Sequence, residues 1–236
     1  MHSPDHKTYT DFRCPKIVDV LPKSTLRFKA NSIQLAQTPV VAIMPFTDTC
    51  RLWREGQVTG WYSYDTVPRD KINSDNLRAM VDTSQIVSIR YDTSYTLRSG
   101  SRDTSQSIYA GHPLFIFNPS TTTNKMEIQD ANLIAVQEAL DSNNQWRPIQ
   151  IWFWSWCGNS FANAVLEPRH FAFIKIPYYD GNFFTSLRVK IHTGHKIIYS
   201  NTYKEWIDYN QFNLPDDLKS KNGEPGFNLT FLNQEQ

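Results

Sequence analysis

The chain has 236 residues, of which 40% are hydrophobic and 14% aromatic, and its 24 basic and 23 acidic side chains give a formal net charge of +1. This composition excludes a disordered chain, and the charge balance excludes nucleic-acid binding through an Arg-rich arm. A chain of this length buries about 70% of its unfolded surface, so it needs no disulfide or metal ion to fold.

Apolar residues alternate with a period of two along most of the chain, which is typical of an all-β domain. The clearest strand covers residues 86–98, where Val87, Ile89 and Tyr91 share one face and Ser88 and Arg90 lie on the other. The remaining expected strands cover residues 25–35 with a bulge or bend near Asn31, 39–45, 113–117, 148–156, 171–176, 185–192 and 196–199. The sequence therefore predicts about eight antiparallel strands.

Two short helices are expected between these strands. Ser74–Val81 begins with a serine that can cap a helix and has an aspartate in its first turn. Asp130–Leu140 places Leu133, Val136 and Leu140 at the spacing of one helix face.

About eight strands with long connections favour a single jelly roll, or antiparallel β-sandwich, over a closed up-and-down barrel. We expect the sandwich to cover residues 25–205, with an N-terminal arm at 1–24 and a polar C-terminal surface tail at 206–236. The N-terminus lacks the apolar run of a signal peptide, and no stretch approaches the roughly 18 apolar residues of a membrane span.

The cysteine and histidine residues that could act in catalysis or metal binding are scattered along the sequence. Cys14, Cys50 and Cys157 are odd in number and widely spaced, so reduced thiols are expected. His192 flanks a turn and, with His195, is a candidate for an anion or metal ion, although a solvated turn is favoured. The hypothesis that Cys157 is a nucleophile with His170 as its general base rests only on their proximity in the sequence. We therefore predict no catalytic residue, no metal site, no cofactor and no enzymatic activity.

The segment 148–156 is aromatic on both faces, since Trp152, Trp154 and Trp156 alternate with Ile151 and Phe153. Large apolar groups on both faces indicate a strand that is buried on both faces. The tryptophan face has three interpretations: burial inside the fold, a subunit interface, or an exposed platform for a sugar.

The order of elements resembles the start of a parvovirus capsid protein. A bent strand at Thr25–Leu35 leads to a strand bracketed by prolines at Pro39–Pro45, then to the helix Ser74–Val81 and the long strand Ile86–Arg98. The segment Arg169–Pro177, with the sequence RHFAFIKIP, is similar to the F-[IV]-K-I-x-P strand near the C-terminus of that family.

This resemblance, of the small densovirus type, implies a capsid protein that assembles into an icosahedral shell of about 60 copies around a single-stranded DNA genome. Its expected location is the virion, with assembly in the host nucleus and binding to a host-cell receptor. Arg188, Lys190 and His192 share one polar strand face and are candidates to contact the genome, and the three tryptophans are candidates for the subunit interface. A capsid protein of another small icosahedral virus with a jelly roll is the nearest alternative.

The chain also departs from the family. It lacks the glycine-rich N-terminal segment and the His-Asp pair of the family's phospholipase region, so no enzymatic activity is implied. A β-sandwich carbohydrate-binding module or lectin that uses the tryptophan face is the alternative function, and an enzyme with an unrecognised site is the third interpretation.

Overall fold

The computed structural model describes residues 12–19, 21–52, 62–63, 73–96, 102–155 and 157–214. Strands dominate these residues, and helical structure within them is limited to two single turns of 3-10 helix, η2 (Gly158–Ser160) and η3 (Tyr209–Phe212). The predicted all-β class is therefore confirmed. Within the same ranges, no helix has the length and apolar character that a membrane crossing requires.

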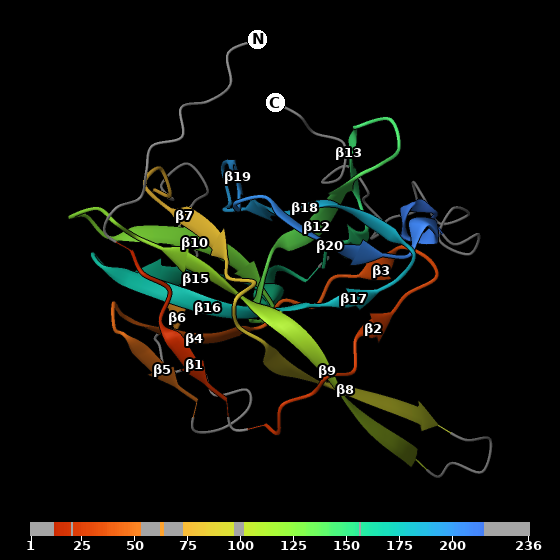
Figure 1. Cartoon of the computed structure of the whole chain (residues 1–236). Helices are drawn as coiled ribbons and strands as arrows, with labels where there is room; N and C mark the ends of the chain where they lie inside the picture. Colours follow the sequence, from red (N-terminus) through yellow and green to blue (C-terminus); the bar gives the residue numbers. More distant parts are fainter. Residues whose placement is uncertain are drawn as a thin grey trace.

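Sheet 1 has the strand order β4 (Val40–Pro45), β16 (His170–Pro177), β9 (Arg102–Phe117) and β7 (Arg78–Val81). The strand β8 (Val87–Thr96) pairs with the other half of β9 in antiparallel register, from Val87 opposite Gly111 to Thr96 opposite Arg102. The β8–β9 hairpin extends beyond the body of the molecule (Figure 1). The inner half of β9 joins it to the body of sheet 1, because residues 111–117 pair with β16 and residues 114–117 also pair with β7.

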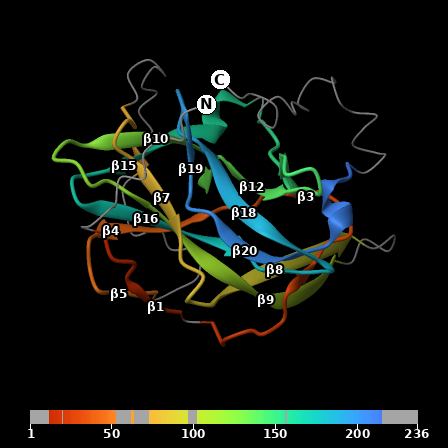
Figure 2. The ribbon, with the colours of Figure 1, turned by 45° about the horizontal axis from the view of Figure 1, so that its top comes forward.

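Sheet 2 has the order β13 (Trp146–Pro148), β12 (Ala135–Leu140), β18 (Phe183–His192) and β19 (Ile197–Tyr199). The strand β20 (Tyr203–Ile207) pairs with the first half of β18, and β19 pairs with its second half. The turned view in Figure 2 shows β18 with β19 and β20 alongside it.

Sheet 3 and three short strand pairs complete the described architecture. Sheet 3 has the order β11 (Asn132–Leu133), β10 (Asn124–Gln129), β15 (Phe161–Leu166) and β6 (Tyr62–Ser63). The short pairs are parallel, and they join β1 (Lys16–Val18) to β5 (Thr49–Arg51), β3 (Gln34–Leu35) to β14 (Gln150–Ile151), and β2 (Phe28–Lys29) to β17 (Tyr179–Asp180).

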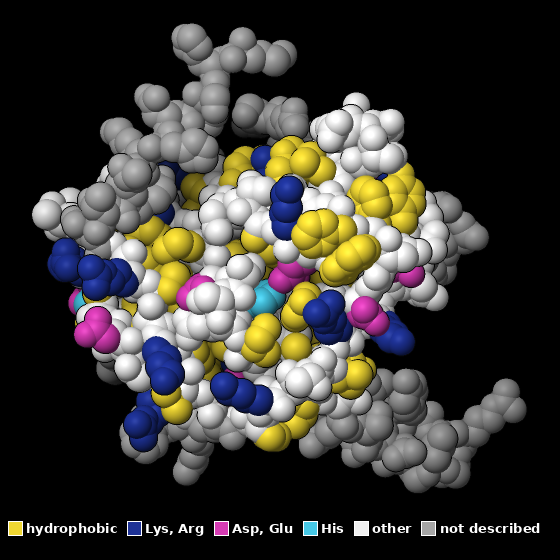
Figure 3. Space-filling model, in the orientation of Figure 1, with side chains coloured by type: hydrophobic (Ala, Val, Ile, Leu, Met, Phe, Trp, Pro, Cys, Tyr) yellow, Lys and Arg dark blue, Asp and Glu magenta, His cyan; other side chains and the backbone are white. Residues whose placement is uncertain are grey.

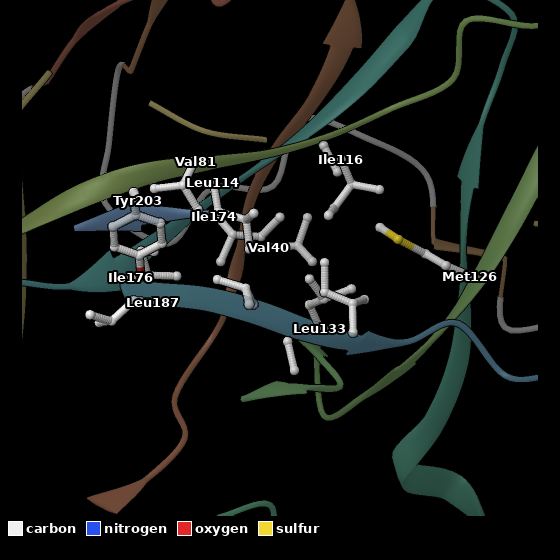
Figure 4. Close-up of a cluster of buried hydrophobic side chains, with 14 of the residues drawn as sticks. Val40, Val81, Leu114, Ile116, Met126, Leu133, Ile174, Ile176, Leu187 and Tyr203 are labelled. Carbon is white, nitrogen blue, oxygen red and sulfur yellow. The ribbon is translucent and has the colours of Figure 1, made fainter. Parts of the chain in front are cut away.

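The main hydrophobic core draws on all three sheets, which meet around it. Its members include Leu114 and Ile174 of sheet 1, Leu187 of sheet 2 and Met126 of sheet 3, all fully buried. Figure 4 shows these side chains gathered in one cluster among the strands, with Leu114 and Ile174 side by side. Burial of this kind contributes about 25 cal/mol per Å² of apolar surface.

Sheet 1 is buried on its outer face as well. Phe115 and Phe117, which alternate along β9 with core residues, belong to a second cluster with Phe12 and Cys50. The rings of Phe12 and Phe117 are stacked, with centroids 4.1 Å apart and planes 8° apart. Phe12 and β1, which lie in the part of the chain expected to be an arm, therefore pack on this sheet.

The helix predicted at Ser74–Val81 is wrong. The Ser74 hydroxyl forms a hydrogen bond with the Thr193 hydroxyl at 2.6 Å rather than capping a helix, and the Leu77 amide closes a turn on the Ser74 carbonyl. Residues 78–81 then form β7, because pairing with β9 satisfies their backbone groups.

The helix predicted at Asp130–Leu140 is also wrong. Asp130 and Ala131 adopt positive φ angles of 49° and 63°, which make the tight turn between β10 and β11. The strand β12 follows with five of its six residues buried. A strand buried on both faces loses the period of two, so its apolar residues matched a helical spacing by coincidence.

The single strand predicted for residues 148–156 is wrong in extent. β13 ends at Pro148 and β14 covers only Gln150–Ile151, while residues 152–155 are not in a strand. The single strand predicted for residues 25–35 is also wrong in extent, because β2 and β3 are separate strands that pair with β17 and β14 in different sheets. The other predicted strands correspond to observed ones, although β9 begins much earlier than residue 113, and residues 97–98 of the predicted strand 86–98 lie outside the described residues. Of the bulge or bend predicted near Asn31, the structure has a bend, which separates β2 from β3.

Candidate functional site

The three residues predicted to face nucleic acid lie on the outer face of sheet 2. Arg188 and Lys190 converge on Glu138 of β12: the Arg188 Nε donates to Glu138 Oε2 at 2.8 Å, and the Lys190 Nζ lies 3.6 Å from Oε1. The side chain of Lys190 is 2% exposed and that of Glu138 is 4% exposed. His192 accepts a hydrogen bond at Nδ1 from the backbone amide of Gly194.

Arg188 is held by aromatic rings as well as by Glu138. Its guanidinium lies 4.3 Å from the ring centroid of Trp146 and 3.9 Å from that of Tyr199. Cation–π contacts of this geometry stabilise the position of the charge. Both cations are thus part of an internal network, and their contact with nucleic acid stays a prediction.

The tryptophan segment is divided between the interior and the surface. Trp152 is 7% exposed, packs with Ile134 and Val136, and donates from Nε1 to Gln129 at 3.3 Å. Trp154 is half-buried and packs against Phe161. Trp156 lies outside the described residues. Burial inside the fold is therefore the correct interpretation for Trp152.

Gln129 fixes the conformation of this segment. Its amide nitrogen donates to the Phe153 carbonyl at 2.9 Å, and its amide oxygen also accepts from the Ser155 backbone amide at 3.2 Å. As a result, Phe153 points outward and is 49% exposed, beside Leu35 at 50%. Both line a cavity of about 400 Å³ together with Asp130. The sequence placed Phe153 on the face of buried Ile151, so this surface was missed.

A second exposed aromatic pair lies on sheet 2. Phe184 and Trp206 are register partners across β18 and β20, with ring centroids 5.2 Å apart, and they are 52% and 44% exposed. Phe184 also borders a cavity of about 320 Å³. Figure 3 shows hydrophobic side chains gathered on this side of the molecule, over β18, β20 and η3.

The remaining candidate groups take separate partners. His195 lies 3.6 Å from Asp75, whereas His192 contacts Trp154, so the two histidines do not converge. The Nδ1 atom of His170 lies 3.0 Å from the Pro168 carbonyl. Across the described ranges, no contact joins Cys157 to His170 and no group of three or more His, Cys, Asp or Glu side chains is placed to hold a metal ion.

A buried ion pair connects sheets 1 and 2. The imidazole of His112 on β9 contacts the carboxylate of Glu205 on β20, and the two side chains are 3% and 7% exposed. Burial lowers the pKa of His112, but the hydrogen bond and charge of Glu205, together with the Gln85 carbonyl 2.9 Å from Nδ1, more than offset it, so the pKa is raised.

Comparison of the chain with protein-family models, with curated proteins and with solved structures finds no match.

Proposed function

We propose that this protein is a structural subunit of a virus, a jelly-roll capsid protein that assembles with copies of itself into an icosahedral shell around the genome. The observation that carries the proposal is the exposed apolar surface formed by Leu35 and Phe153. Each is about half exposed, and the two side chains border one cavity. Clustered exposed apolar side chains of this kind mark protein–protein contacts.

The position of this surface supports contact between copies. Phe153 is held on a segment that three hydrogen bonds to Gln129 fix in place, and β14, which ends two residues before it, pairs with β3. A preformed apolar surface loses little conformational entropy on association. The net charge of +1 also gives copies of the chain little mutual repulsion.

The all-β body suits a shell subunit in a second way. Its sheets share one core, and the β8–β9 hairpin extends from them (Figure 1). An extended hairpin offers backbone groups and side chains to a neighbouring copy, as a closed ring or shell requires. Packaging of single-stranded DNA is part of the proposal and rests on the resemblance rather than on a basic surface.

The test is the oligomeric state of the purified full chain, measured by size-exclusion chromatography with light scattering and by negative-stain microscopy. We expect closed particles, which Phe153→Ser combined with Leu35→Ser reduces to small species. Phe184→Ser, which changes an equally exposed residue on sheet 2, serves as the control that retains assembly. A stable monomer under all assembly conditions contradicts the proposal, as does unchanged assembly of the double variant.

A further inference from the structure

We propose that His112 and Glu205 form a pH-dependent clamp, which holds the edge strand β20 against sheet 1 while His112 is protonated and lets that strand open locally when the proton is lost. This inference is independent of the shell proposal, because it concerns one strand within a single copy of the chain. It rests on the two contacts of the His112 ring, the burial of Glu205 and the place of β20 at the edge of sheet 2.

The contacts of the His112 ring require its protonated form. The Nδ1 atom lies 2.9 Å from the backbone carbonyl oxygen of Gln85, and the Nε2 atom contacts the Glu205 carboxylate. Both partners are acceptors, and only the imidazolium has an N–H on each ring nitrogen, because neutral imidazole has a single N–H. Loss of the proton therefore leaves one ring nitrogen facing an acceptor with no hydrogen between them, whichever tautomer forms.

Glu205 depends on this one partner. Its side chain is 7% exposed, and its second oxygen, Oε2, is buried with no hydrogen-bond partner among the described residues. A buried carboxylate without a compensating charge is strongly unfavourable, because it has lost its hydration. Once His112 is neutral, opening of the strand returns water to the Glu205 carboxylate, so the open state gains relative to the closed one.

The surroundings of the pair leave His112 as the group that responds near neutral pH. The other charged and titratable groups that face the pair are Asp82 from the β7–β8 loop, Tyr178 after β16, Tyr203 on β20 and Arg27, whose guanidinium lies 4.2 Å from the Tyr178 ring centroid. Burial raises the pKa of both tyrosines, so they stay neutral, and an arginine keeps its charge. Histidine has an ordinary pKa of about 6.5.

The strand β20 is the part of the clamp that is free to move. It pairs with β18 through Tyr203–Ile207, and no other described strand pairs with it. His112, by contrast, is opposite Ile176 of β16 inside sheet 1. Gln85 is fixed as well, because its amide donates to Asp82 at 2.7 Å and accepts from the Ile17 backbone amide at 2.8 Å. Opening therefore takes Glu205 away from His112 rather than the reverse.

The proton sets how often β20 opens. Burial disfavours the imidazolium, but the hydrogen bond and charge of Glu205, the Gln85 carbonyl and the charge of Asp82 outweigh it, so the pKa of His112 is raised in the closed state. In the open state we expect the ordinary pKa of about 6.5. Between these two values the ratio of open to closed molecules rises with pH, by up to about tenfold for each pH unit.

The experiment is amide hydrogen exchange of the full chain, followed by mass spectrometry from about pH 6 to about pH 9 and corrected for the intrinsic effect of pH on exchange. We expect the protection of the Tyr203–Ile207 amides to fall with pH, by up to about tenfold for each unit through the transition. The protection of β16, inside sheet 1, should stay constant over the same range.

Two variants separate the clamp from other histidine effects. Glu205→Gln removes the charge that favours the imidazolium, so the protection of β20 should become independent of pH. His170→Gln is the matched control: the ring of His170 lies 3.8 Å from Glu167, which is 67% exposed, and its loss should leave the pH dependence of β20 unchanged.

Nuclear magnetic resonance of the His112 ring in the original chain gives a measurement that needs no variant, and we expect its pKa above 6.5. The inference is overturned if His112 titrates at or below that value, if β20 keeps the same protection throughout, or if β16 loses protection in parallel with it. It is also overturned if Glu205→Gln retains the pH dependence of the original chain, or if His170→Gln abolishes it.

Discussion

Replacing Glu138 by Gln tests the ion network on the outer face of sheet 2. Glu138 is 4% exposed and lies 3.6 Å from the ammonium of Lys190, which is 2% exposed, and 2.8 Å from the guanidinium of Arg188. Removing one partner of a buried ion pair costs about 3–5 kcal/mol, because the remaining charge loses its compensation. The Arg188 side chain is 18% exposed, so its charge regains some hydration in the variant. We therefore expect the free energy of unfolding to fall by an amount near the lower limit, about 3 kcal/mol.

The loss is measured by urea unfolding followed by tryptophan fluorescence, and by the thermal midpoint, which should fall by roughly 6–12 °C. Asp75→Asn is the matched control: Asp75 is 72% exposed and lies 3.1 Å from the Lys196 ammonium, so its loss should cost less than about 1 kcal/mol. If Glu138→Gln loses no more stability than Asp75→Asn, burial does not determine how much this ion network stabilises the fold.

Two further predictions follow from buried titratable groups. The pKa of His112 is raised above 6.5 in the folded chain, so its contact with Glu205 contributes stability that is complete below that pH and fades as the pH rises through the folded pKa. The stability difference between the original chain and His112→Gln in urea should be larger at about pH 6 than at about pH 9, and a difference independent of pH would contradict this. Burial raises the pKa of Cys14 to about 12 and that of Cys50 to about 11, whereas Cys157 is exposed. Of these three thiols only Cys157 should react with a disulfide reagent at about pH 8 before unfolding, and Cys157→Ser should abolish that reaction.

The fold class could be predicted because half-buried strands carry a signal with a period of two. β8 and β18 both show it, since each has one polar face. The same signal is absent from β12, because that strand is buried on both faces. The positive φ angles of Asp130 and Ala131, which precede it, are determined by the hairpin rather than by residue type. Tertiary pairing with β9 likewise decided the conformation of Arg78–Val81.

The candidate surfaces could be predicted only in part. Alternation correctly placed Arg188 and Lys190 on one face, but their partner Glu138 lies fifty residues earlier in the chain, so no local pattern shows that the charges are paired. The pairing of Phe184 with Trp206 likewise depends on the register between β18 and β20. The unusual density of aromatic residues in 148–156 did point to the neighbourhood of Phe153, although not to Phe153 itself.

The order of strands in sheet 1 has a consequence for synthesis of the chain. β16, which ends at Pro177, lies between β4 and β9, so the middle of the sheet is the last of its strands to leave the ribosome. Until then Phe115 and Phe117 of β9 lack Phe171 and Phe173, their neighbours in the outer cluster. We therefore expect a nascent chain that stops before residue 170 to have an incomplete sheet 1 with exposed apolar side chains. Chaperones should bind the nascent chain most strongly between the synthesis of β9 and that of β16.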